Sequence, residues 1–142
     1  MLKPCSLEAI MTKRILLVED ELTWQKNILD GLKALPCTVE TATYMREAVL
    51  CLRDNDYDIV ISDYMFPAFK EIGWQNEVKG LGIDVLREVR SKDPKLPFIL
   101  HTSSIDDNVI KAVERLGGTY HKKDSGMSVS SLIALVKEKL AL

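Results

Sequence analysis

A carboxylate that directly follows a buried strand is the most informative chemical group in this sequence. The run Ile59-Val60-Ile61 is β-branched and carries no charge, which is typical of a strand buried on both faces of a parallel sheet. Asp63 comes just after this run, at the end of the strand where open α/β sheets bind their ligands. An aspartate that merely caps a turn would give the same local pattern, so the rest of the chain has to decide.

Other polar groups follow the ends of other predicted strands. Glu19 and Asp20 follow the apolar run 14–18, Thr102 ends the run 98–102, and Lys123 follows the short run 119–121. In a parallel sheet these strand ends meet at one edge. The sequence therefore predicts that two further acids, one hydroxyl and one amine lie close to Asp63.

Such a cluster needs positive charge. Carboxylates about 5 Å apart repel by roughly 3 kcal/mol per pair at an effective dielectric constant near 20. Lys123 can offset part of this repulsion, and Mg²⁺ suits a site made of a few carboxylates and water. A carboxylate beside a cation and an amine can attack phosphorus and form an acyl phosphate, with Thr102 donating a hydrogen bond to a phosphoryl oxygen.

Five predicted strands alternate with five predicted helices, which indicates an α/β fold with a parallel sheet covered on both faces. The predicted strands cover residues 14–18, 38–41, 59–61, 98–102 and 119–121. The predicted helices cover about 22–35, 42–53, 82–92, 106–116 and 128–140. Pro36 ends the first helix, Asp106 or Asp107 caps the fourth, and Pro67 is expected to stop regular structure after Asp63.

Bulk properties exclude several classes of protein. The chain has 142 residues and a net charge of −2, so it forms one domain and shows no electrostatic footprint for nucleic acid. We find no apolar run that could span a bilayer and no secretory signal. Three scattered cysteines and two histidines make no zinc pattern, and reduced thiols indicate a cytoplasmic protein.

Five segments together resemble the receiver domain of two-component response regulators. The resemblance extends from about Lys13 to Leu140, after an N-terminal extension of residues 1–12, and the domain would run over 13–142. The segments are 15–21, 58–67, 82–87, 97–103 and 120–124. The resemblance implies a flavodoxin-like three-layer sandwich whose five-stranded parallel sheet has the order 2-1-3-4-5.

The resemblance also implies the function of the acidic cluster. Asp63 would accept a phosphoryl group from a phosphohistidine on a sensor histidine kinase or phosphotransfer protein, in phosphorelay signalling. Glu19, Asp20 and Asp63, with the backbone carbonyl of Met65, would bind Mg²⁺ or Mn²⁺. Such a protein is a signalling switch that assists its own phosphorylation and dephosphorylation, and is not otherwise an enzyme.

The remaining implied roles concern switching and output. Thr102 and Lys123 would hold the phosphoryl group, Thr102 and Tyr120 would change position on activation, and Met65 and Ser104 would influence how long the phosphate survives. The output surface would be the fourth helix, fifth strand and fifth helix, which are residues 106–116, Tyr120 and 128–140. Because no second domain follows Leu142, we expect output through a partner protein, from a monomer or a phosphorylation-dependent dimer, without direct contact to nucleic acid or membrane.

The sequence departs from the family pattern in the loop after Asp63. Fourteen residues separate Pro67 from Gly82, whereas strand-to-helix loops usually have about 2–6 residues. The insertion, at about 68–80, carries four apolar residues among polar and charged ones. The apolar residues are Phe69, Ile72, Trp74 and Val78, and the others are Lys70, Glu71, Gln75, Glu77 and Lys79. It either packs on its own side chains, lacks order, limits access to Asp63, or selects a partner.

Two other functions fit the same fold. A receiver-like module could bind a partner without phosphorylation, although the intact set of acids, threonine and lysine argues against this. A metal-dependent phosphohydrolase would need a second acid shortly after its nucleophile, where Tyr64 and Met65 stand. Away from this set, Trp24 and Cys51 are predicted to pack against the core, as are the two histidines, His101 and His121, in the core or at its edge.

Overall fold

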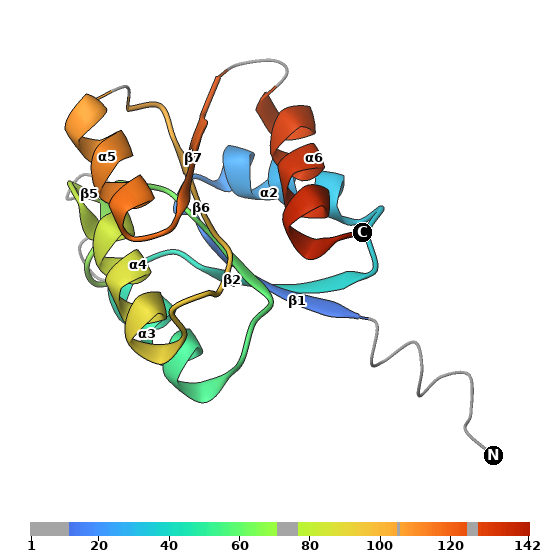
Figure 1. Ribbon diagram of the computed structural model, residues 1–142, viewed down its shortest axis with the longest axis horizontal. Coiled ribbons are helices and arrows are strands. Elements are labelled where there is room, and N and C mark those ends of the chain that lie inside the picture. Colours follow the sequence, from blue (N-terminus) through green and yellow to red (C-terminus); the bar gives the residue numbers. More distant parts are fainter. Residues whose placement is uncertain (1–11, 71–76, 105, 125–127) are drawn as a thin grey trace.

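A computed structural model describes residues 12–70, 77–104, 106–124 and 128–142. Of the predicted N-terminal extension it describes only Thr12. A five-stranded parallel sheet runs through the molecule in the order β2-β1-β3-β6-β7 (Figure 1). These strands are β1 (Lys13–Val18), β2 (Cys37–Ala42), β3 (Ile59–Ser62), β6 (Phe98–Thr102) and β7 (Thr119–Lys122). The predicted order 2-1-3-4-5 is confirmed, because these are the five sheet strands in chain order.

Helices cover both faces of the sheet. On one face lie α2 (Leu22–Leu32) and α6 (Ser128–Leu140), which pack against each other. On the other face lie α3 (Met45–Asp54), α4 (Leu81–Lys92) and α5 (Asp107–Arg115), as Figure 1 shows. The predicted three-layer α/β sandwich is therefore confirmed, and Asp106 caps α5 by accepting a hydrogen bond from the Asn108 N–H at 2.8 Å.

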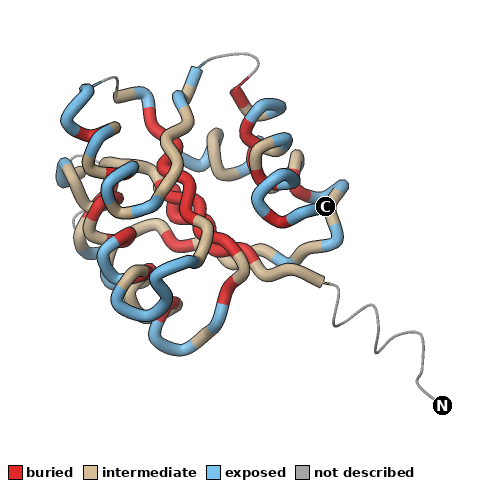
Figure 2. The backbone as a smooth tube through the Cα atoms, in the orientation of Figure 1, coloured by how far each residue is buried: buried red, intermediate tan, exposed pale blue. Residues whose placement is uncertain are grey.

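The central strands are buried on both faces, because alternate side chains enter two different cores (Figure 2). Leu16, Val60 and Leu100 belong to the core under α3, α4 and α5. Ile61 and Ile99 face each other in register and belong to the core under α2 and α6. This arrangement is what the uninterrupted apolar runs in the sequence predict.

Three details of the predicted elements are wrong. α2 ends at Leu32 and not near residue 35. Pro36 disfavours helical geometry in the residue before it, so the chain leaves the helix in a turn before Pro36. Ala42 lies in β2 and not in the next helix, because it pairs with Val18 across the sheet. Pro67 does not stop regular structure but lies in the short strand β4 (Phe66–Pro67).

The described part of the insertion begins as a two-stranded antiparallel ribbon. Phe66 pairs with Val78 and Pro67 pairs with Glu77, so β4 lies beside β5 (Glu77–Val78). Phe66 is fully buried in the core, and the Ala68 carbonyl accepts a hydrogen bond from the Arg46 N–H at 3.3 Å. The base of the insertion is therefore anchored to the core and to α3, while Ile72 and Trp74 lie outside the described residues.

Candidate functional site

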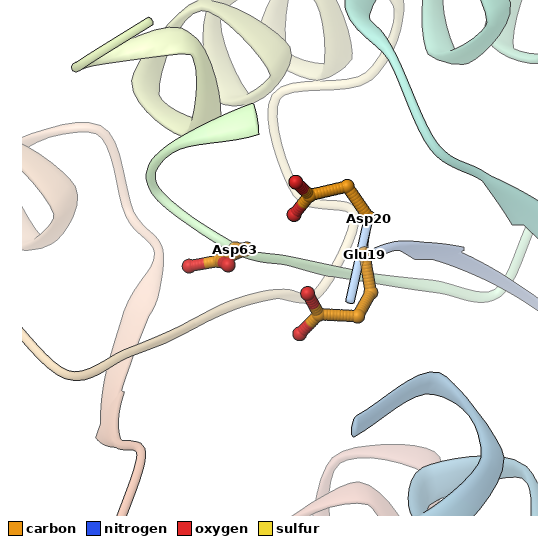
Figure 3. Close-up of side chains that lie close together, drawn as sticks. All are labelled: Glu19, Asp20 and Asp63. Carbon is orange, nitrogen blue, oxygen red and sulfur yellow. The ribbon is translucent and has the colours of Figure 1, made fainter. Parts of the chain in front are cut away.

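Three carboxylates meet at the carboxyl edge of the sheet. Glu19 and Asp20 follow β1, and Asp63 follows β3. One oxygen from each lies within 4.8 Å of the other two, and the carboxylates turn towards a common space (Figure 3). The strands produce this meeting, because β1 and β3 are neighbours in register and the Asp63 N–H continues their ladder to the Val18 carbonyl at 2.9 Å.

Lys123 partly neutralises this cluster. Its Nζ donates to Glu19 Oε1 at 2.7 Å and to Asp63 Oδ2 at 3.0 Å. Only 7% of the lysine side chain and 12% of the Asp63 side chain are exposed, so these interactions are weakly screened by water. The backbone holds Lys123 in place through its N–H, which donates to the Thr102 carbonyl at 2.7 Å.

Burial changes the proton affinities of the buried pair. Burial and the neighbouring charge of Asp63 raise the pKa of Glu19, and Lys123 offsets this only in part. Burial alone would lower the pKa of Lys123, but Asp63 and Glu19 raise it above its usual value. Lys123 therefore stays charged, and Glu19 holds its proton more tightly than a free carboxylate does.

The carboxylate of Asp20 has no positively charged partner among the residues that the structure describes. Both of its carboxylate oxygens are shielded from water and lack a hydrogen-bond partner among the residues that the structure describes. Burial, followed by the charge of Glu77, raises the pKa of Asp20 to about 6. Unpaired buried oxygens are costly, and hard oxygen ligands in this number suit Mg²⁺. The acidic cluster therefore fits a divalent cation.

Thr102 and Tyr120 are connected through the loop that follows β6. The Thr102 side chain is buried, and its Oγ1 accepts a hydrogen bond from the Ser104 N–H at 3.2 Å. The Tyr120 hydroxyl donates to the Ser104 carbonyl at 2.7 Å. A movement of Thr102 would thus change the contacts of Tyr120 through Ser104, which is bonded to both side chains.

A pocket of about 360 Å³ opens over Asp63. The predicted residues Met65, Thr102, Ser104 and Lys123 line it, whereas Tyr120 is absent from the lining and reaches the site only through Ser104. The structure thus brings the predicted residues together, and the role of the Met65 carbonyl stays a prediction.

Three residues that line the pocket, Trp24, Glu77 and Lys79, were not assigned to the site from the sequence. Trp24 lies with its ring centre 5.1 Å from Lys123 Nζ, a cation–π distance, besides packing edge-on against His101. Glu77 and Lys79 line the pocket from the insertion. Trp24 sits out of step with the apolar face of its helix, which is the only sequence signal that could have marked it.

The two histidines are not among the residues that line the pocket. His101 is fully buried, as predicted, and stacks near His121 with ring centres 5.3 Å apart. Burial, with the charge of Lys123, lowers the pKa of His101 to about 3, so this ring stays neutral. Cys51 is half-buried and packs against the core, as predicted.

Gly82 allows α4 to approach the loop that carries Asp63. A Cβ atom at this position would lie 2.2 Å from the Asp63 carbonyl oxygen and 2.8 Å from the Tyr64 Cα. The Gly82 N–H donates to the Tyr64 carbonyl at 3.0 Å. A glycine is needed here for close backbone contact, which fixes the loop after Asp63.

Comparison with known protein families shows which family the chain belongs to. The model of the response regulator receiver domain matches residues 15–126, which is most of the chain. The chain belongs to the response regulator receiver family. The resemblance inferred from five short segments is confirmed. Receiver domains generally bind Mg²⁺ at an acidic pocket, and this chain has an acidic cluster of Glu19, Asp20 and Asp63.

Solved receiver structures share the fold. The non-phosphorylated HemR receiver domain of Leptospira biflexa is 23% identical, with a TM-score of 0.75 over 92% of this chain and 95% of that chain. CheY4 of Vibrio cholerae is 19% identical, with a TM-score of 0.72 over 90% and 98%. The phosphorylated cyanobacterial phytochrome response regulator RcpA is 26% identical, with a TM-score of 0.68 over 89% and 90%. A search of curated proteins found no match.

The receiver family supports a role in phosphorelay signalling, with kinases and downstream proteins as general partners.

In the described part of the chain, none of the helices combines the length and hydropathy required to cross a bilayer.

Proposed function

We propose that this receiver domain accepts a phosphoryl group on Asp63 from a phosphohistidine of a sensor histidine kinase or phosphotransfer protein. The observation that carries this proposal is the position of the Asp63 carboxylate. Its Oδ1 accepts from the Tyr64 N–H at 2.7 Å, and its Oδ2 accepts from Lys123 at 3.0 Å. The carboxylate is thereby oriented into a pocket that also holds Thr102.

Asp63 would act as the nucleophile in an in-line transfer. One carboxylate oxygen forms a bond to phosphorus while the phosphorus–nitrogen bond of the phosphohistidine breaks, and the electron pair returns to the imidazole nitrogen, which then takes a proton. Lys123 exchanges part of its contact with Asp63 for a phosphoryl oxygen, and Thr102 donates its hydroxyl hydrogen to another.

A divalent cation would be held by Asp20 and Asp63, with Glu19 behind them and the Met65 carbonyl as a further ligand. The unpaired oxygens of Asp20 support this assignment. Mg²⁺, or Mn²⁺ in its place, would neutralise charge on the transferring phosphoryl group.

Phosphorylation would be communicated through Ser104. A phosphoryl group that draws the Thr102 hydroxyl inward removes the acceptor of the Ser104 N–H, and the Ser104 carbonyl in turn holds Tyr120. Loop residues between β6 and α5 then bias the face formed by α5, β7 and α6, which would bind the downstream protein. Met65 and Ser104, which line the pocket, would set the phosphate lifetime.

The protein would be a switch and not an enzyme for an external substrate. It would catalyse only its own phosphorylation and dephosphorylation, either as a monomer or as a phosphorylation-dependent dimer. The sequence supports this view, because Tyr64 and Met65 stand where a phosphohydrolase would need a second acid.

Treatment with acetyl phosphate and Mg²⁺, followed by intact mass measurement, tests the proposal. Wild-type protein should gain the mass of one phosphoryl group, and Asp63→Asn, which keeps the size of the side chain, should gain none. A folded wild type that stays unmodified would favour a receiver-like module that binds its partner without phosphate. Equal modification of Asp63→Asn would place the acceptor elsewhere, and steady turnover of phosphate esters would favour the phosphohydrolase.

A further inference from the structure

The insertion delivers an acidic residue to the pocket over Asp63. Glu77 lies in β5, opposite Pro67, and this ribbon is anchored through the fully buried Phe66. The ribbon continues directly from the loop after Asp63, so its position is tied to the backbone of the site. Glu77 is therefore held at the pocket by the core, although it belongs to the part of the chain that departs from the family pattern.

Glu77 shares the pocket with the phosphoacceptor. Asp63, Thr102 and Lys123 line the pocket from the sheet, and Glu77 lines it from the ribbon. The electrostatic effects are mutual in this cluster. After burial, Glu77 is the strongest influence that raises the pKa of Asp20, and burial followed by the charge of Asp63 raises the pKa of Glu77.

The charges around the pocket do not balance. Lys123 is already bonded to Glu19 and Asp63, and the two Asp20 oxygens have no partner among the described residues. A fourth carboxylate, from Glu77, increases the excess of negative charge, and the two other charged lining residues, Glu21 and Lys79, carry opposite charges. Such an excess attracts a divalent cation and repels an incoming anion, and both effects act over several ångströms.

We propose that the charge of Glu77 strengthens the binding of a divalent cation at this site and slows the approach of anionic phosphodonors to Asp63. This inference rests on the proposed function, because it needs both the cation and the phosphoryl transfer. The insertion would thus lower the concentration of divalent cation that phosphorylation needs, and would slow the reaction at saturating cation, through a residue that lies outside the segments resembling the family.

Calorimetric titration with Mg²⁺ alone tests the first half of the inference. Glu77→Gln keeps the shape of the side chain and removes its charge, and should weaken Mg²⁺ binding about fivefold to tenfold at low ionic strength. Glu88→Gln, which removes an exposed charge on α4, is the matched control and should bind Mg²⁺ like the wild type. The difference between Glu77→Gln and wild type should shrink as salt is added.

The rate of phosphorylation by acetyl phosphate at saturating Mg²⁺ tests the second half. Glu77→Gln should react about twofold faster than wild type, because one repulsive charge is gone. Opposite changes in affinity and rate are not expected from a residue that only supports the fold.

Unchanged Mg²⁺ affinity in Glu77→Gln would overturn the inference, and so would weaker affinity together with slower phosphorylation and a lower melting temperature. A wild type that binds no Mg²⁺ and accepts no phosphoryl group would instead overturn the proposed function, so the two failures are distinguishable.

Discussion

The two ends of the sheet treat their charges differently. At the amino end, the Arg14 N–H donates to Asp58 Oδ2 at 2.8 Å, and the Arg14 guanidinium pairs with Glu40 and reaches Asn55 Oδ1 at 3.3 Å. At the carboxyl end, three carboxylates lie within 4.8 Å of one another, and Lys123 bonds to two of them. The amino end is closed by internal pairing, and the carboxyl end is left short of positive charge.

This difference shows that the interactions that oppose folding are concentrated at the carboxyl end of the sheet. Exposed pairs such as Arg14 with Glu40 contribute little but cost little. Buried carboxylates with one counter-ion oppose folding unless a ligand arrives. Since the same parallel strands carry both ends, the imbalance belongs to the site and not to the sheet. Four predictions would break or sharpen this comparison.

Removing Lys123 should have the largest effect on stability. Lys123→Met leaves Glu19 and Asp63 without their common partner, and should lower the free energy of unfolding by about 3 kcal/mol at pH 7.5. Urea unfolding measures this loss, which should grow as the pH rises through about 8, because burial raises the pKa of Glu19 to about 8 and its carboxyl group then loses its proton.

The matched change at the amino end is Lys92→Met. Lys92 Nζ donates to the Leu52 carbonyl at 2.7 Å and pairs with the exposed Asp56 at 3.1 Å, so its loss should cost only about 1 kcal/mol. Equal losses for both variants would contradict the contrast between the two ends.

Gly82→Ala should be the next largest disruption. Its Cβ would meet the Asp63 carbonyl oxygen and the Tyr64 backbone, which cannot yield easily, so we expect a loss of about 2–3 kcal/mol in urea unfolding and slower phosphorylation of Asp63. At Gly80, whose φ is 90° and whose Cβ would meet nothing within 4 Å, alanine should cost about 1 kcal/mol. A smaller loss at Gly82 than at Gly80 would refute the close-contact argument.

Asp20→Asn should stabilise the metal-free protein. The pKa of Asp20 is about 6 in the folded protein, against a usual value of 3.8, so the folded state binds the proton more tightly. Stability from this group is present below pH 4 and is lost as the pH rises through 6. At pH 7.5 in the presence of a chelator, Asp20→Asn should be more stable than wild type by about 1 kcal/mol, after allowance for solvent screening.

Thermal unfolding between pH 4 and pH 7.5 measures this effect. The advantage of Asp20→Asn should vanish near pH 4, and Mg²⁺ should raise the melting temperature of the wild type but not of the variant. An advantage that does not change with pH would point to a cause other than the charge of Asp20.

The smallest effect is expected at the amino end. Glu40→Gln removes the partner of the Arg14 guanidinium, whose side chain is 43% exposed, and should change the free energy of unfolding by less than about 1 kcal/mol. Urea unfolding in low and high salt checks this. A loss of unfolding free energy as large as that of Lys123→Met would contradict the difference between the two ends of the sheet.

The elements and the edge that holds the site could be predicted from the sequence. Apolar runs such as Ile59–Ile61 specify strands buried on both faces, and the direction of a parallel sheet sends Asp63, Thr102 and Lys123 to one edge. Boundaries were less predictable, because Ala42 became part of a strand only through its pairing with Val18.

Contacts between distant parts of the chain were decided by the tertiary structure alone. The placement of Glu77 at the pocket depends on a two-residue ribbon whose pairing leaves no periodic signal. The cation–π contact between Lys123 and Trp24 and the hydrogen bond from Tyr120 to Ser104 likewise join separate elements. Local periodicity encodes which element forms and which face is buried, whereas the neighbours of a side chain across elements depend on how the whole core packs.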